Sequence, residues 1–270
     1  MLRRKNEVPN FINIRKYMET WDQYSYEQGL HYCFEAKQNE RLFRLTEIIL
    51  EILDIKDVPM NGYSIQRITD KVDEGDSGII YSNIFYDSAN KFITPVYYVA
   101  KMVEAYEKEN IYSERKMAGK VARGLRAFPS FIREMDLEYK LGETLISVES
   151  VRSPEQDIQD HADMLLRYDG QEYRVWSYQR TNRGLINTSE RLLGRRGELP
   201  YGFHLLCPID IFNEDESEDI FGWKLYSDEY VQKVVNVLRL KRMDQYSEII
   251  YRSRDYVKEY IKDVHIFEKK

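Results

Sequence analysis

Two alternating runs joined by a turn decide the fold: His161-Ala162-Asp163-Met164-Leu165-Leu166-Arg167-Tyr168, then Asp169-Gly170, then Gln171-Glu172-Tyr173-Arg174-Val175-Trp176-Ser177-Tyr178-Gln179. Both runs have the composition of β-strands, and Asp-Gly is a preferred pair for a two-residue hairpin turn because both of its residues adopt positive φ. The stretch therefore predicts a β-hairpin between residues 161 and 179.

Helical periodicity dominates the chain before this hairpin. Apolar residues recur every three or four positions over 39–55 and over 94–109, which predicts two amphipathic helices. A third helix is predicted over 113–127 and should end near Pro129, because proline lacks an N–H and restricts the residue before it. Ser130 is then the predicted N-cap of a fourth helix, which should stop at Gly142.

After the hairpin, residues 188–193 predict a short helix and 203–209 an apolar buried strand closed by Pro208. The acidic run over 214–219 predicts a solvated surface loop, because like charges repel. Apolar spacing over 228–267, including Ile249, Ile250, Tyr256 and Ile261, predicts two packed helices. The predicted fold class is α/β (α+β), with a mainly helical region over 1–128, an α/β core over 129–212, and the acidic loop with C-terminal helices over 213–270.

Composition limits the classes of function. The formal net charge of −6 argues against a protein covered in basic charge, yet it permits a local basic groove. No run approaches the roughly 18 apolar residues of a membrane span, and the first residues lack the apolar segment of a signal peptide, so we expect a cytoplasmic protein without membrane contact. Cys33 and Cys207 have no zinc-ligand spacing, and no nucleotide-binding or dinucleotide-binding motif is present.

A helix bearing carboxylates, the hairpin, a short helix and a buried strand follow one another as an αββαβ series. Between residues 131 and 210 this order resembles the PD-(D/E)XK (restriction-endonuclease-like) nuclease superfamily, in which a helix glutamate, a hairpin aspartate and a Glu-x-Lys motif gather magnesium beside a phosphodiester. Glu134 matches the helix position and Asp163 the hairpin aspartate, while Ser177-Tyr178-Gln179 stands where Glu-x-Lys is expected. The resemblance implies Mg²⁺ or Mn²⁺ held by Asp163 and Glu134, with Gln179 and Ser177 in the catalytic set, although serine in the carboxylate position removes a charged ligand.

Strand parity places one demand on this site. Ser177 and Gln179 share a face, because residues i and i+2 of a strand point the same way. A two-residue turn at Asp169-Gly170 pairs Asp163 with Trp176 and takes it off that face, whereas a three-residue connection or one bulge pairs it with Ser177. Both registers stay open, and the active-site hypothesis needs the odd loop or the bulge. Glu155, Asp157 or Asp160 could replace a missing ligand.

Arginines gather among glycines just after the hairpin, where they suit charge-assisted contacts with phosphates. Lys116 shares a helix face with two further basic residues and could extend that surface. The predicted nucleic-acid-binding residues are Arg180, Arg183, Arg191, Arg195, Arg196, Lys120 and Arg123. Surface salt bridges are the alternative explanation of the same residues.

Three functions follow from these observations and stay open. The first is a metal-dependent nuclease acting on DNA, in restriction or antiphage defence. The second is a catalytically inactive protein of the nuclease fold that binds nucleic acid or a partner protein in a larger complex. The third is an interaction subunit, with a protein partner or a homo-oligomer, for which the 22 tyrosines suit an interface. Metal binding at Asp163 separates the first two, and salt-dependent DNA binding separates both from the third.

Overall fold

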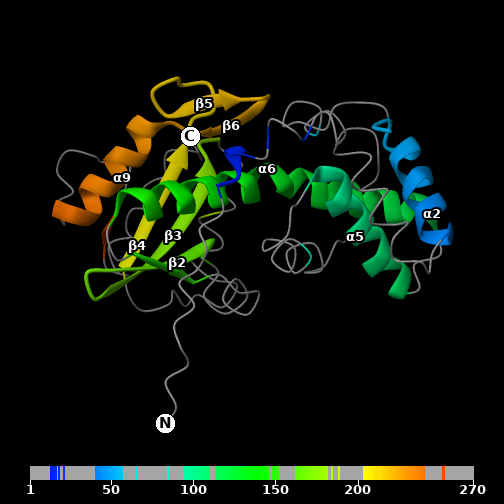
Figure 1. The fold of residues 1–270 in the computed structure, drawn as a ribbon, viewed down its shortest axis with the longest axis horizontal. Coiled ribbons are helices and arrows are strands. Elements are labelled where there is room, and N and C mark those ends of the chain that lie inside the picture. The colour runs from blue at the N-terminus through cyan, green and yellow to red at the C-terminus, as the bar shows by residue number, and fades with distance from the viewer. Residues whose placement is uncertain are drawn as a thin grey trace, which may run out of the picture. The chain divides into compact units, whose positions relative to one another are not determined.

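The computed structural model describes residues 13–16, 18, 21, 40–56, 65, 84, 94–109, 113–145, 148–151, 162–181, 184, 188, 203–240 and 251–252. They form a mixed α+β protein (Figure 1). The described residues divide into two compact units: one contains those between 133 and 218 and those from 225 onward, and the other contains those between 13 and 132 together with 219–224. None of the described helices has both the length and the apolar composition that crossing a bilayer requires.

Two of the predicted helices are confirmed in the second of these units. Helix α2 spans Glu40–Ile52 and helix α5 spans Pro95–Lys108. The start of α5 follows directly from its sequence, because Thr94 accepts a hydrogen bond from the N–H of Tyr97 at 3.1 Å and Pro95 occupies the first helical position, where no N–H is needed. The apolar face that predicted α5 is buried, whereas α2 buries Leu42 and Ile49 and leaves Ile52 37% exposed.

Helix α6 spans Glu114–Thr144 without a break, so the predicted end near Pro129 and the predicted N-cap at Ser130 are wrong. The helix also continues past Gly142. An internal proline costs about 3 kcal/mol because it removes one backbone hydrogen bond and crowds the preceding turn. Here the neighbours Leu125, Phe128 and Ile132 are fully buried, and their packing offsets that local cost.

A five-stranded sheet organises the other unit, in the order β1-β2-β3-β4-β7. Its strands are β1 (Glu149–Val151), β2 (Met164–Tyr168), β3 (Gln171–Gln179), β4 (Phe203–Ile209) and β7 (Tyr251–Arg252). All neighbours are antiparallel except β3 and β4, which are parallel. The predicted hairpin is confirmed, with Asp169 and Gly170 at positive φ of 51° and 71°, and so is the predicted buried strand β4.

One face of this sheet forms the main hydrophobic core. Alternate residues of β2, β3 and β4, among them Leu166, Val175 and Leu205, pack against the C-terminal half of α6 and against α9, which spans Asp228–Leu240. Figure 1 shows α9 alongside the strands. The first predicted tail helix is therefore confirmed.

The remaining C-terminal predictions need correction. Part of the acidic run forms strand β5 (Ser217–Ile220), which pairs with β6 (Trp223–Tyr226), and Glu216 is buried rather than solvated. Its carboxylate accepts the N–H of Asp210 at 2.8 Å and contacts Arg180 at 3.0 Å, so ionic partners overcome the repulsion between like charges. Strand β7 interrupts the second predicted tail helix, because Tyr251 pairs with Leu205 of β4. The predicted positions Ile249, Ile250, Tyr256 and Ile261 lie outside the described residues, as does the predicted helix over 188–193 except for Thr188, which is helical.

Candidate functional site

Asp163 stands where the pairing between β2 and β3 ends. The turn has two residues, and Met164 pairs with Val175, so strict alternation would place Asp163 opposite Trp176. The N–H of Asp163, however, donates to the carbonyl of Val175 at 3.0 Å. Two residues of one strand thus oppose one residue of the other, which is the arrangement of a β-bulge. The structure therefore combines the two-residue turn with a bulge at Asp163.

The bulge brings the Asp163 carboxylate to Ser177. Its Oδ2 atom accepts the backbone N–H of Ser177 at 2.6 Å, within the range of a charge-assisted hydrogen bond. That N–H lies beyond the last paired residues of the hairpin, where no strand partner supplies an acceptor. The side chain of Asp163 therefore completes the backbone hydrogen bonding of β3, a role that needs no metal.

The Ser177 hydroxyl is held by a second buried network. Its Oγ atom lies 2.8 Å from the hydroxyl oxygen of Tyr226, and the Tyr226 hydroxyl donates to the carbonyl of Cys207 at 2.7 Å. Because a phenol has a single proton, Ser177 must be the donor to Tyr226. Both side chains are buried, so water does not compete with these bonds. The residue in the third-motif position is thus committed to protein partners.

The groups around Ser177 favour their neutral forms, with one buried cation beside them. Burial raises the pKa of Tyr226 well above 10.0 and also raises the pKa of the Cys207 thiol, and the nearby Asp163 charge adds to both effects. Desolvation lowers the pKa of the buried Arg133, and electrostatic interactions with Tyr226 and Glu134 partly raise it again. A protonated thiol is a poor nucleophile, so Cys207 is not suited to covalent catalysis.

The other two predicted catalytic residues have different surroundings. Glu134 is buried on α6 within electrostatic reach of Arg133, so its charge has a structural counterpart. Gln179 is half-buried at the end of β3, and its side-chain amide makes no hydrogen bond to the residues that the structure describes. The structure thus brings Asp163 and Ser177 into direct contact.

Part of the predicted metal-binding set is already bonded to the protein itself. Magnesium takes several hard oxygen ligands in near-octahedral geometry. Within the described ranges, no three His, Cys, Asp or Glu side chains gather closely enough to hold a metal ion. One oxygen of Asp163 is used by the Ser177 N–H, the Ser177 hydroxyl is used by Tyr226, and the buried guanidinium of Arg133 interacts electrostatically with Tyr226. The predicted Mg²⁺ or Mn²⁺ remains a prediction, as do the substitute ligands Glu155, Asp157 and Asp160, which lie outside the described residues.

The predicted nucleic-acid-binding residues have different surroundings. Arg180 pairs with Glu216, and the Lys120 ammonium lies 5.3 Å from the ring centre of Tyr106. Arg123 and the neighbouring Lys116 are exposed on α6. Arg183, Arg191, Arg195 and Arg196 lie outside the described residues. The structure adds the exposed Arg115, which immediately precedes Lys116. It was not predicted, because it does not share the helix face of Lys116, Lys120 and Arg123.

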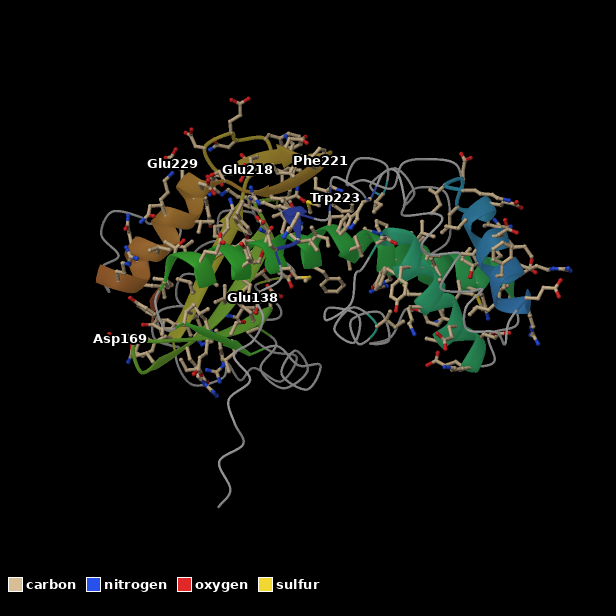
Figure 2. All side chains as sticks on the ribbon, viewed as in Figure 1. Glu138, Asp169, Glu218, Phe221, Trp223 and Glu229 are labelled. Carbon is tan, nitrogen blue, oxygen red and sulfur yellow. The ribbon has the colours of Figure 1, made fainter. Side chains whose placement is uncertain are left out.

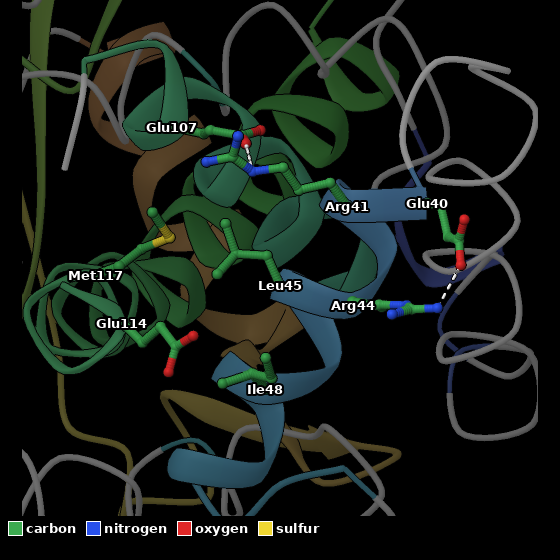
Figure 3. A pocket seen from close by; sticks show the side chains of 8 residues that line it. All are labelled: Glu40, Arg41, Arg44, Leu45, Ile48, Glu107, Glu114 and Met117. Carbon is green, nitrogen blue, oxygen red and sulfur yellow. Dashed lines mark hydrogen bonds and ion pairs between the residues drawn. The ribbon is translucent and has the colours of Figure 1, made fainter. Parts of the chain in front are cut away.

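A surface hollow of about 570 Å³ lies between α2, α5 and α6 (Figure 3). Leu45, Ile48 and Met117 form its apolar part, and Arg41 pairs with Glu107 at its margin at 2.9 Å. The charged residues at its rim are largely neutralised by such ion pairs. The hollow could therefore contact an apolar ligand but has few polar groups that would orient it.

Comparisons with protein-family models, with curated proteins and with solved structures found no match to this chain. Its function is therefore inferred from its own residues.

Proposed function

We propose that this chain is a non-catalytic nucleic-acid-binding protein whose N-terminal half of α6 contacts phosphates. The observation that carries the proposal is a set of four cations, Arg115, Lys116, Lys120 and Arg123, hereafter the basic face of α6. Arg115, Lys116 and Arg123 are exposed and form no ion pair within the described parts of the chain. These three exposed cations on one helix favour an anionic partner.

The position of these charges strengthens the inference. Arg115 and Lys116 lie in the first turn of α6, where the helix dipole already presents partial positive charge. Cations there cost about 0.3–1 kcal/mol each, so helix stability does not explain them. Lys116 and Arg123 are about 10 Å apart along the helix axis. That span meets more than one phosphate of a strand whose charges recur about every 3.4 Å.

The network around Ser177 supports the non-catalytic part of the proposal. A nuclease of the expected type needs oxygen ligands that are free to hold a metal and position water. Here the two residues at the hairpin positions of the site, Asp163 and Ser177, bond to the protein itself. These bonds give both side chains a role in the fold, which supports a non-catalytic protein.

Salt dependence tests the binding. Fluorescence anisotropy with labelled DNA and RNA, in single-stranded and duplex form, gives the affinity over a series of salt concentrations. Replacing Lys116, Lys120 and Arg123 together by alanine should weaken binding and reduce the slope of log K against log salt by about 2 for a single strand, since each phosphate contact contributes about 0.7.

A matched control removes three other cations from the same unit. Arg41, Arg44 and Lys108 are exposed on α2 and α5, and each pairs with a glutamate. Their joint replacement by alanine changes the net charge equally and should leave the slope unchanged. An equal effect of both triple variants would show that only overall charge matters and would refute the assignment to α6.

Cleavage tests the non-catalytic part. Linear and supercoiled plasmid are incubated with the protein and Mg²⁺ or Mn²⁺, and then with EDTA, beside the Asp163→Asn variant. The amide oxygen of asparagine can still accept the Ser177 N–H, so this variant should fold. We expect no cleavage by either protein. Metal-dependent cleavage that disappears in Asp163→Asn would contradict the proposal and establish a nuclease.

A further inference from the structure

Two hairpins of this protein share one turn conformation but not one turn sequence. In the β2–β3 hairpin, Asp169 and Gly170 have φ of 51° and 71°, and in the β5–β6 hairpin, Phe221 and Gly222 have φ of 50° and 81°. Aspartate and asparagine tolerate this left-handed region because their short polar side chains bond locally. A bulky aromatic residue there is an outlier whose backbone is strained. Phenylalanine is therefore poorly suited to the positive φ of position 221.

Burial explains this strain only in part. Phe221 is 50% exposed, so it gains only part of the hydrophobic stabilisation that could offset the cost. The turn around it is nevertheless well fixed. The N–H of Gly222 donates to Asp219 at 2.8 Å, and Asp219 pairs with Lys224 at 3.5 Å, which leaves the tip without surplus negative charge. A strained residue that persists in a fixed and exposed position points to a function.

The hairpin tip is anchored to the helix that carries the basic face. Trp223 is buried, and its ring centre lies 5.7 Å from that of Phe128 of α6. Figure 2 shows Phe221 and Trp223 together at the end of this hairpin. Phe128 follows Lys120 by eight residues, which is about 12 Å along the helix and about 80° around it, and it follows Arg123 by five, about 7.5 Å along and about 140° around. Phe221 and the basic face of α6 belong to the same compact unit, at a separation that a few nucleotides could span.

We propose that Phe221 stacks on an unpaired base of a single-stranded nucleic acid whose phosphates contact the basic face of α6. This inference rests on the proposed nucleic-acid binding and specifies its substrate as single-stranded. Aromatic side chains beside a cationic track are the means by which proteins hold single strands, because every base offers a flat face. In a duplex those faces are already stacked on one another, so an exposed phenylalanine adds little.

The test uses the variant Phe221→Asn, because asparagine relieves the backbone strain while it removes the aromatic ring. We expect the melting temperature to rise by about 2 °C. The affinity for a labelled oligothymidylate should fall roughly tenfold, within the range measured for loss of one stacked base. Affinity for a duplex of the same length should stay unchanged. Phe221→Trp should keep the oligothymidylate affinity of the parent protein.

Asp169→Asn is the matched control, since it places asparagine at the equivalent turn position of the other hairpin. It should alter neither melting temperature nor affinity. If Phe221→Asn is more stable and binds oligothymidylate as tightly as the parent, Phe221 does not stack, whereas a salt slope lowered by the Lys116/Lys120/Arg123 variant would still uphold binding at α6. If Phe221→Asn lost affinity equally for the oligothymidylate and the duplex, the proposed preference for a single strand would be overturned. Unchanged binding in both variants would refute both proposals.

Discussion

Replacing Tyr226 with phenylalanine removes one oxygen atom that makes two buried hydrogen bonds. It leaves the Ser177 hydroxyl without an acceptor and the Cys207 carbonyl without this donor. Ser177 is only 9% exposed, so solvent is a poor substitute. A buried polar group that loses its partner costs about 1–3 kcal/mol. We expect Tyr226→Phe to lower the free energy of unfolding by about 2–3 kcal/mol.

The matched change Ser177→Ala should cost less, about 1 kcal/mol. It removes the same bond between the two hydroxyls, but Tyr226 keeps its bond to Cys207. In the double variant no hydroxyl is left unsatisfied at position 177. The double variant should therefore lose about 1 kcal/mol less free energy of unfolding than the two single variants lose in sum.

Urea unfolding followed by circular dichroism measures these three losses. Amide hydrogen exchange of peptides from β3 and β4 confirms that the change arises in the sheet. Additivity of the two single variants within about 0.3 kcal/mol would show that Ser177 and Tyr226 do not share a bond. That result would refute the reasoning that the Ser177 hydroxyl is committed to the fold.

Three further changes probe the same unit. Burial raises the pKa of Cys207 above 9.0 and those of Tyr226 and Tyr230 above 10.0, so the folded state retains protons that the unfolded state releases. Stability should therefore be complete well below pH 9 and should fall progressively as the pH rises above 9, and Cys207→Ala should flatten the first part of that fall in urea titrations. The ammonium of Lys140 contacts Glu218 at 2.8 Å, the Tyr226 carbonyl at 2.9 Å and Asp228 at 2.5 Å. Lys140→Met should therefore cost about 2 kcal/mol in urea unfolding, whereas Asp228→Ala, at a side chain that is 89% exposed, should cost under about 0.5 kcal/mol. A Cβ atom at Gly184 would lie 2.1 Å from the Gln179 carbonyl oxygen, so Gly184→Ala should lower the melting temperature more than Gly170→Ala, which meets no atom but has a positive φ.

Local signals predicted the elements that local physics determines. The Asp-Gly turn defined the hairpin, and apolar spacing located α2, α5 and α9. The prediction that a helix ends near Pro129 was wrong, because burial of the neighbouring side chains outweighs the missing hydrogen bond. No local sequence pattern reveals that burial. The acidic run was misjudged for a similar reason, since its charges meet Arg180 and Lys140 from distant segments.

The candidate site shows the same division. The predicted pairing of Asp163 with Ser177 does not occur, because the Asp163 N–H bonds to Val175, and it is the Asp163 side chain that reaches the Ser177 N–H. The partner of the Ser177 hydroxyl could not be foreseen, because Tyr226 is 49 residues away in sequence. The strain at Phe221 was equally hidden, since its φ depends on the pairing of β5 with β6 rather than on residue type.

The position of β7 bears on how the chain reaches its folded state during synthesis. Strand β4 is almost wholly buried, and on the side that β3 does not cover, β7 pairs with its residues His204 and Leu205. Until residues 251 and 252 have been made, these two residues of an apolar strand lack that pairing, and open strand edges can recruit strands from other molecules. We therefore expect chains that stop before residue 251 to aggregate more readily than the full chain.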